Sequence, residues 1–120
     1  MSISGPHIRS EHWRAMDLTV PSGGVTAGQM DLIEDTVGIW AETKDAGETC
    51  AFIYQADAIL VPKSTMSLDI FKAGDKVYFD HADEEVNISS GSNTLCGRAL
   101  EDAAAADTEV LIDLEGHLAA

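Results

Sequence analysis

FKAGDKVYFD, residues 71–80, carries the clearest structural pattern in the chain. Its segment Ala73-Gly-Asp75 is typical of a turn, because glycine takes positive φ at no steric cost and aspartate hydrogen-bonds nearby backbone. The five residues after the turn alternate, so that Val77 and Phe79 share one face and the residues between them share the other. We therefore predict a half-buried strand at residues 76–80.

The stretch EVLIDLE, residues 109–115, alternates in the same way, with Val110, Ile112 and Leu114 on one side. Both stretches offer one apolar face to a shared core. From residue 25 onward, similar short runs recur between turn residues about every eight to twelve positions, a spacing typical of a barrel or sandwich. The sequence thus predicts an all-β fold, a small antiparallel β-barrel or sandwich.

The expected strands can be placed along the chain from these patterns. An Ala-rich connection at 101–107 is expected to hold at most one or two helical turns, because seven residues are too few for a self-supporting helix. The residues before Pro62 are expected to form a central strand interrupted by a bulge. It is expected to stop at Pro62, because proline cannot donate to a ladder. The predicted strands are 15–20, 29–33, 37–43, 48–55 continuing at 58–61, 76–80, 85–88, 94–100 and 109–115. A loop is expected at 63–67, and residues 68–71 lead from it toward the strand at 76–80.

Composition limits the classes of function. The 120 residues suffice for one domain, and 7 basic against 21 acidic residues give a net charge of −14. Nucleic-acid binding needs clustered cations, so we do not expect a nucleic-acid partner. No apolar run approaches the roughly eighteen residues of a membrane span, and the N-terminus lacks the apolar core of a secretory signal. We expect a soluble protein made in a cytoplasm, with no membrane partner.

The first sixteen residues differ from the rest, because Arg9 and Arg14 stand there against one glutamate. We divide the chain into an N-terminal arm, residues 1–16, and a folded domain, residues 17–120. The arm is either a tail or first strand without a separate task, or a segment that lies on an acidic neighbour with Trp13 as its anchor. The sequence leaves both possibilities open.

Chemical motifs are scarce. Cys50 and Cys96 lack metal-site spacing, so free, partly buried thiols are favoured over a disulfide or a metal site. The segment Pro21-Ser-Gly-Gly24 could cradle a phosphate, but no phosphate-binding motif surrounds it. Acidic residues gather around His81, between Asp80 and Glu85, where a solvated turn is favoured over a divalent-cation site. We therefore predict no enzyme activity, catalytic residue, bound metal or cofactor.

Five segments in order resemble the capsid cement, or head decoration, proteins of tailed bacteriophages, a family that has also carried a recombinase-like label. The segments are Val20-Pro-Ser-Gly-Gly-Val-Thr-Ala-Gly28, Gly47-Glu48 before an apolar strand that ends Leu60-Val-Pro-Lys63, Ala73-Gly-Asp-Lys-Val-Tyr-Phe-Asp80, Thr94-Leu-Cys-Gly-Arg-Ala-Leu100 and Asp107-Thr-Glu-Val-Leu-Ile-Asp-Leu114. The recombinase label finds no support, because the chain lacks a phosphate-binding loop. The long N-terminus and the acidic composition depart from the family pattern.

The resemblance implies a β-tulip-like domain on the outer surface of an icosahedral head, where it stabilises the shell. Its expected partners are the major capsid protein and itself, as a homotrimer at threefold and quasi-threefold positions or alternatively as a dimer. A soluble β adaptor unrelated to capsids is the alternative function. Trp40 is either a second-layer core residue, which is favoured, or a subunit contact. The residues expected to contact the shell or a neighbouring subunit are Arg9, Trp13, Arg14, Trp40, Tyr54 and Tyr78.

Overall fold

The computed structural model describes residues 7–8 and 12–116, and within them every regular element is a β-strand. All strand pairs are antiparallel, which confirms the predicted all-β class. Neighbouring strands follow the order β3-β4-β5-β9-β8-β6-β7, while β1 and β2 also pair with β5. The strands are β1 His7–Ile8, β2 Trp13–Thr19, β3 Met30–Ile33, β4 Thr36–Trp40, β5 Thr49–Pro62, β6 Lys76–Asp80, β7 Glu85–Asn87, β8 Thr94–Ala99 and β9 Glu109–Glu115.

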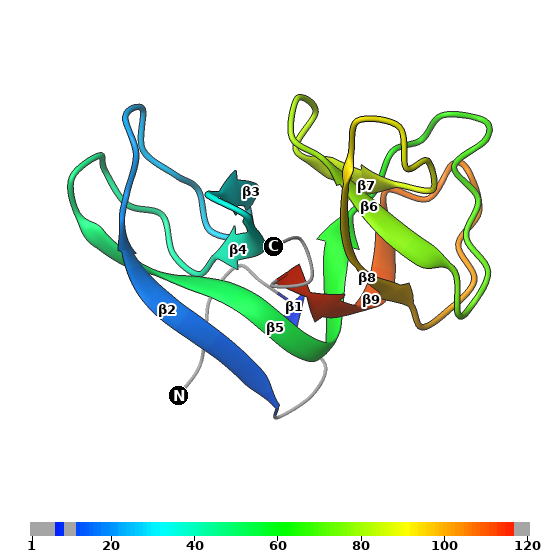
Figure 1. Cartoon of the computed structure of the whole chain (residues 1–120), viewed down its shortest axis with the longest axis horizontal. Helices are drawn as coiled ribbons and strands as arrows, with labels where there is room; N and C mark the ends of the chain where they lie inside the picture. The colour runs from blue at the N-terminus through cyan, green and yellow to red at the C-terminus, as the bar shows by residue number, and fades with distance from the viewer. Residues whose placement is uncertain (1–6, 9–11, 117–120) are drawn as a thin grey trace.

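Strand β5 pairs with strands of both halves of the molecule. In Figure 1 it runs from the N-terminal half, formed with β1 to β4, into the C-terminal half, formed with β6 to β9. Its pairing with β9 shifts register between Ala56 and Ile59, at the bulge that the sequence suggested. Just beyond its end, Lys63 forms a parallel bridge to Val86, so the C-terminal half curls nearly into a closed barrel.

The two alternating stretches behave as predicted. On β6, Val77 and Phe79 are buried, and on β9 the same holds for Val110, Ile112 and Leu114. Each strand therefore turns one apolar face inward, because successive side chains of a strand point to opposite sides.

The core joins the two halves. Met30 and Val37 from the N-terminal half belong to the same buried cluster as Phe79 and Ile112 from the C-terminal half. A second, smaller cluster lies under β2 and contains Val20, Val25, Trp40, Cys50 and Phe52. Both cysteines are free and buried, which agrees with the favoured expectation.

Two segments differ from expectation. Strand β2 begins at Trp13 rather than Ala15, because Trp13 and Arg14 pair with Ala56 and Gln55 of β5. The Ala-rich connection contains no helix: Ala103 instead forms a bridge with Phe71, which holds the segment extended against the sheet. A separate function for the N-terminal arm stays a prediction.

Gly97 on β8 lies at a close approach of two backbone segments. A Cβ atom at this position would overlap the carbonyl oxygen of Asp113 and lie 3.1 Å from its carbonyl carbon. Because β8 and β9 are paired here, with Gly97 opposite Leu114, any larger residue has to push the two strands apart.

Candidate binding surfaces

A hollow of about 400 Å³ lies where β2 begins, between this strand and β5. Backbone pairing of Trp13 with Ala56 and of Arg14 with Gln55 sets its geometry. His12 Nδ1 lies 3.3 Å from Asp57 Oδ2, and both side chains are exposed. The hollow is lined by His12, Trp13, Arg14, Gln55 and Asp57. It therefore brings together two of the residues that the sequence singled out, Trp13 and Arg14.

These two residues are held differently. Trp13 is partly buried and packs against the main core cluster. Arg14 is exposed, so its guanidinium is available to a partner. Arg9 lies outside the described residues.

The three other predicted contact residues are not gathered into one surface. Trp40 is fully buried within one chain, so the interior alternative is the one observed. Its ring centroid lies 4.9 Å from that of Phe52. Tyr54 on β5 and Tyr78 on β6 are partly exposed, but their strands are not neighbours in the sheet.

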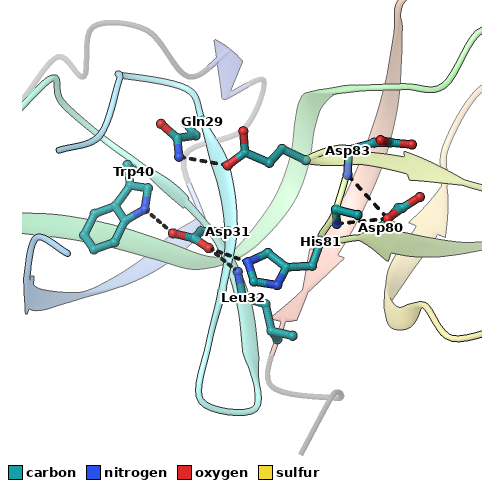
Figure 2. A network of polar contacts seen from close by, with 9 residues as sticks. Gln29, Asp31, Leu32, Trp40, Asp80, His81 and Asp83 are labelled. Carbon is teal, nitrogen blue, oxygen red and sulfur yellow. Dashed lines mark hydrogen bonds and ion pairs between the residues drawn. The ribbon is translucent and has the colours of Figure 1, made fainter. Parts of the chain in front are cut away.

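A polar network that the sequence did not predict connects the hairpin β3–β4 with the tip of the hairpin β6–β7. Figure 2 shows Asp31 between the Trp40 indole and the His81 imidazole. Trp40 Nε1 donates to Asp31 Oδ2 at 3.1 Å, and the backbone N–H of Leu32 donates to Oδ1 at 2.8 Å. His81 Nε2 lies 3.3 Å from Oδ1, an ion pair when the imidazole is protonated. The only hint in the sequence is an aspartate inside an otherwise apolar strand.

The acidic hairpin tip is organised by hydrogen bonds of its own. Asp80 Oδ1 accepts from the backbone N–H groups of Ala82 and Asp83, at 3.0 and 3.4 Å, and Glu84 Oε2 accepts from Gln29 Nε2 at 3.1 Å. The pKa of Glu85 is raised by partial burial and then by the neighbouring carboxylates, although Lys63 opposes the shift. Among residues 7–8 and 12–116, no group of three or more histidine, cysteine or acidic side chains is arranged to hold a metal ion.

Lys63 is an unexpected interior cation, 2% exposed. Its Nζ donates to three backbone carbonyl oxygens: that of Ser64 at 2.6 Å, Ala105 at 3.1 Å and Asp107 at 3.3 Å. The ammonium thereby ties the 101–108 connection to the end of β5. Burial of a charge is costly unless such bonds replace water.

The apolar loop, residues 64–70, is the second candidate binding surface. The sequence did not predict a binding surface there. Its Met66, Leu68 and Ile70 are 70%, 83% and 47% exposed. In Figure 1 this loop is the green trace that follows β5 at the upper right. The alternating apolar residues favour a half-buried strand, but the structure turns them outward.

The buried Cys96 thiol is a poor nucleophile. Burial raises the pKa of Cys96 to about 12, which disfavours the thiolate that nucleophilic chemistry requires. Nor do the described residues include a helix long and apolar enough to cross a membrane.

The comparisons with known proteins agree with a structural rather than a catalytic reading. A family model described as phage cement protein matches residues 10–114, a span that covers β2 to β8 and most of β9. A search of curated proteins finds no match to this chain.

Proposed function

This chain belongs to the phage cement protein family, and we propose that it binds the outer surface of an icosahedral phage head and stabilises the capsid lattice. Family membership itself gives the protein a structural role in the phage capsid. Its proposed direct partner there is the major capsid protein. We further propose that it is synthesised in the host cytoplasm and added to the head from outside.

The observation that carries this proposal is the family match across 105 consecutive residues, 10–114. The fold supports it, because a small β domain whose main core cluster joins both halves can act as a rigid wedge between shell subunits. A cement protein works by adhesion, so its function depends on surfaces rather than on a reactive centre.

The proposed assembly is a homotrimer at threefold and quasi-threefold positions of the head. A cyclic trimer uses a heterologous interface that closes after three copies. Each bound copy raises the effective concentration of the next contact, so several weak contacts give stable decoration. Partly exposed Tyr54 and Tyr78 remain proposed contact residues, whereas buried Trp40 would need the fold to open.

The hollow beside β2 is the proposed contact with the shell. Arg14 supplies an exposed cation there, and Trp13 supplies an aromatic wall that is already fixed by core packing. Arginine and tryptophan are enriched among residues that dominate binding energy. Arg9, which lies outside the described residues, remains a proposed contact residue.

Co-sedimentation of the purified chain with heads that lack it tests the proposal. We expect saturable binding, and we expect Arg14→Glu to weaken it about tenfold or more, since a hydrogen bond to a charged group contributes about 1.5–3 kcal/mol. Arg98→Glu is the matched control, because Arg98 is an exposed arginine on β8 in the C-terminal half.

Failure of the wild-type chain to sediment with heads would favour the adaptor alternative. Equal binding by wild type and Arg14→Glu would remove the hollow from the proposed contact while leaving the cement function intact. Differential scanning calorimetry of decorated and bare heads measures stabilisation directly, and decorated heads are expected to melt at higher temperature.

A further inference from the structure

Exposed apolar side chains are concentrated in one short segment. Within the part of the chain that the structure describes, the large exposed hydrophobic residues are Met66, Leu68, Ile70 and Leu100. Three of these four lie within the apolar loop. Single exposed hydrophobics are ordinary, but a group of them marks an interaction surface.

The loop is held in place by buried polar groups. Ser64 N donates to the carbonyl of Val86 at 2.9 Å, and Met66 N donates to Ser64 Oγ at 3.2 Å. Asp69, which is 8% exposed, accepts from Ile88 N through Oδ1 at 3.2 Å. Asp69 N also donates to the carbonyl oxygen of Met66 at 2.9 Å, which closes a turn over residues 66–69 with Leu68 exposed on it. The backbone conformation of the loop therefore keeps these apolar side chains exposed.

The apolar loop and the segment packed beside it lack exposed charged side chains. None of the 7 basic and 21 acidic residues falls in 64–68 or 86–97. These segments are joined by the Ser64–Val86 and Asp69–Ile88 hydrogen bonds, and Figure 1 shows the green and gold loops together at the upper right. We call residues 64–70 and 86–95 the neutral cap; its one charged residue, Asp69, is buried.

The charge distribution indicates which partner fits this cap. Each copy carries a net charge of −14, so two copies repel wherever acidic faces meet. A basic partner would be drawn to the acidic faces, where its charges gain most. Two copies of this acidic chain can pack together most favourably through a face where the contact does not remove water from any carboxylate.

We propose that the neutral cap is the surface through which copies of this chain contact one another. This inference rests on the self-assembly included in the proposed function and adds the residues that carry it. Leu68, the most exposed of the apolar residues, is the central anchor, with Met66 and Ile70 beside it. Burying a leucine side chain removes its apolar surface from water, and a trimer repeats this gain at each of its interfaces.

Sedimentation velocity of the full chain over a range of concentrations tests the inference. Wild type is expected to self-associate, and Leu68→Asp to raise the dissociation constant about tenfold or more by placing a carboxylate in the contact. Leu100→Asp is the matched control: Leu100 is also an exposed leucine, but it lies beside Glu101 and Asp102, outside the cap. Circular dichroism melts verify that each variant is folded.

The dependence of self-association on salt concentration provides a second test. Screening weakens repulsion between acidic surfaces, so wild-type self-association is expected to strengthen from 50 mM to about 500 mM NaCl. An interface built from ion pairs would weaken instead, which would overturn the inference. A monomeric wild type, equal assembly by Leu68→Asp, or equal loss in Leu100→Asp would also overturn it.

The two proposals fail separately. If wild type binds heads but shows no cap-dependent self-association, the cement function stands and the cap assignment is wrong. If wild type self-associates through the cap but does not bind heads, the cap assignment stands and the head-surface proposal is wrong.

Discussion

The carboxylate of Asp31 accepts hydrogen bonds from Trp40 and Leu32 and faces His81 of the other hairpin. Trp40 could be expected inside the fold from its strand, but its partner could not be identified from sequence. The contact between Asp31 and His81 exists only because β5 and the shared core bring two distant hairpins together. Periodicity predicts which face of a strand is buried, and it carries no information on such pairings.

Asp113 allows a prediction about pH at the scale of one side chain. Burial raises its pKa, and Glu115 and Asp57 raise it further. Its Oδ1 is buried and has no hydrogen-bond partner among the described residues. A raised pKa means that the folded state binds the proton more tightly than the unfolded state, so ionised Asp113 destabilises the fold at neutral pH.

We therefore expect Asp113→Asn to be more stable than wild type at pH 7, by at most about 1 kcal/mol, because the side chain is only partly buried and solvent screens its charge. The gain should shrink as pH falls through the raised pKa toward about 4, because wild-type Asp113 then becomes protonated itself. Urea unfolding at both pH values measures the difference. Asp35→Asn, on an exposed turn, controls for the altered net charge, and a variant less stable than wild type at pH 7 would contradict the prediction.

At the scale of elements, the strands with clear alternation, β6 and β9, were predicted with their buried faces, and the bulge in β5 followed from its two apolar segments. The apolar loop was not predicted to be exposed, because the pattern of Met66, Leu68 and Ile70 equally fits a strand with these residues inward. The segment instead forms a turn closed by Asp69 N and the Met66 carbonyl, and the Asp69 side chain accepts from the backbone of Ile88. A hydrogen bond between distant segments thus overrides the local pattern.

The pairing of β8 with β9 yields a second prediction. Gly97→Ala is expected to lower the free energy of unfolding by about 2–3 kcal/mol, because its Cβ would collide with the Asp113 carbonyl. Gly74→Ala is the comparison: nothing lies within 4 Å of its added Cβ, but its φ of +97° strains an alanine, at a cost of about 1 kcal/mol. Urea unfolding of both variants separates collision from backbone strain. Equal losses would show that the strands can move apart easily.

On the scale of the whole molecule, one buried cluster spans both halves and β5 crosses between them. The all-β class and the single core could be predicted from composition and periodicity. The neutral cap could not, because it forms from two segments that are adjacent only in the folded chain. The assembly of copies also depends on surfaces that a pattern along one chain does not describe.

The shared core predicts that the two halves unfold together. Trp13 and Trp40, the two tryptophans, both lie in the N-terminal half, whereas circular dichroism follows strands in both halves. We expect fluorescence and circular dichroism to give coincident urea transitions, as in a two-state domain. A dichroism change that continues after the fluorescence change is complete would instead indicate a separately stable C-terminal half.

The interior position of both thiols has a practical consequence for engineering. Cys50 and Cys96 are 2% and 0% exposed, and the chain contains no other cysteine. A cysteine introduced at exposed Ala46, in the turn before β5, would therefore be the preferred target of a maleimide reagent. Phage heads coated with this variant could carry a dye or peptide cargo at one defined point on every copy.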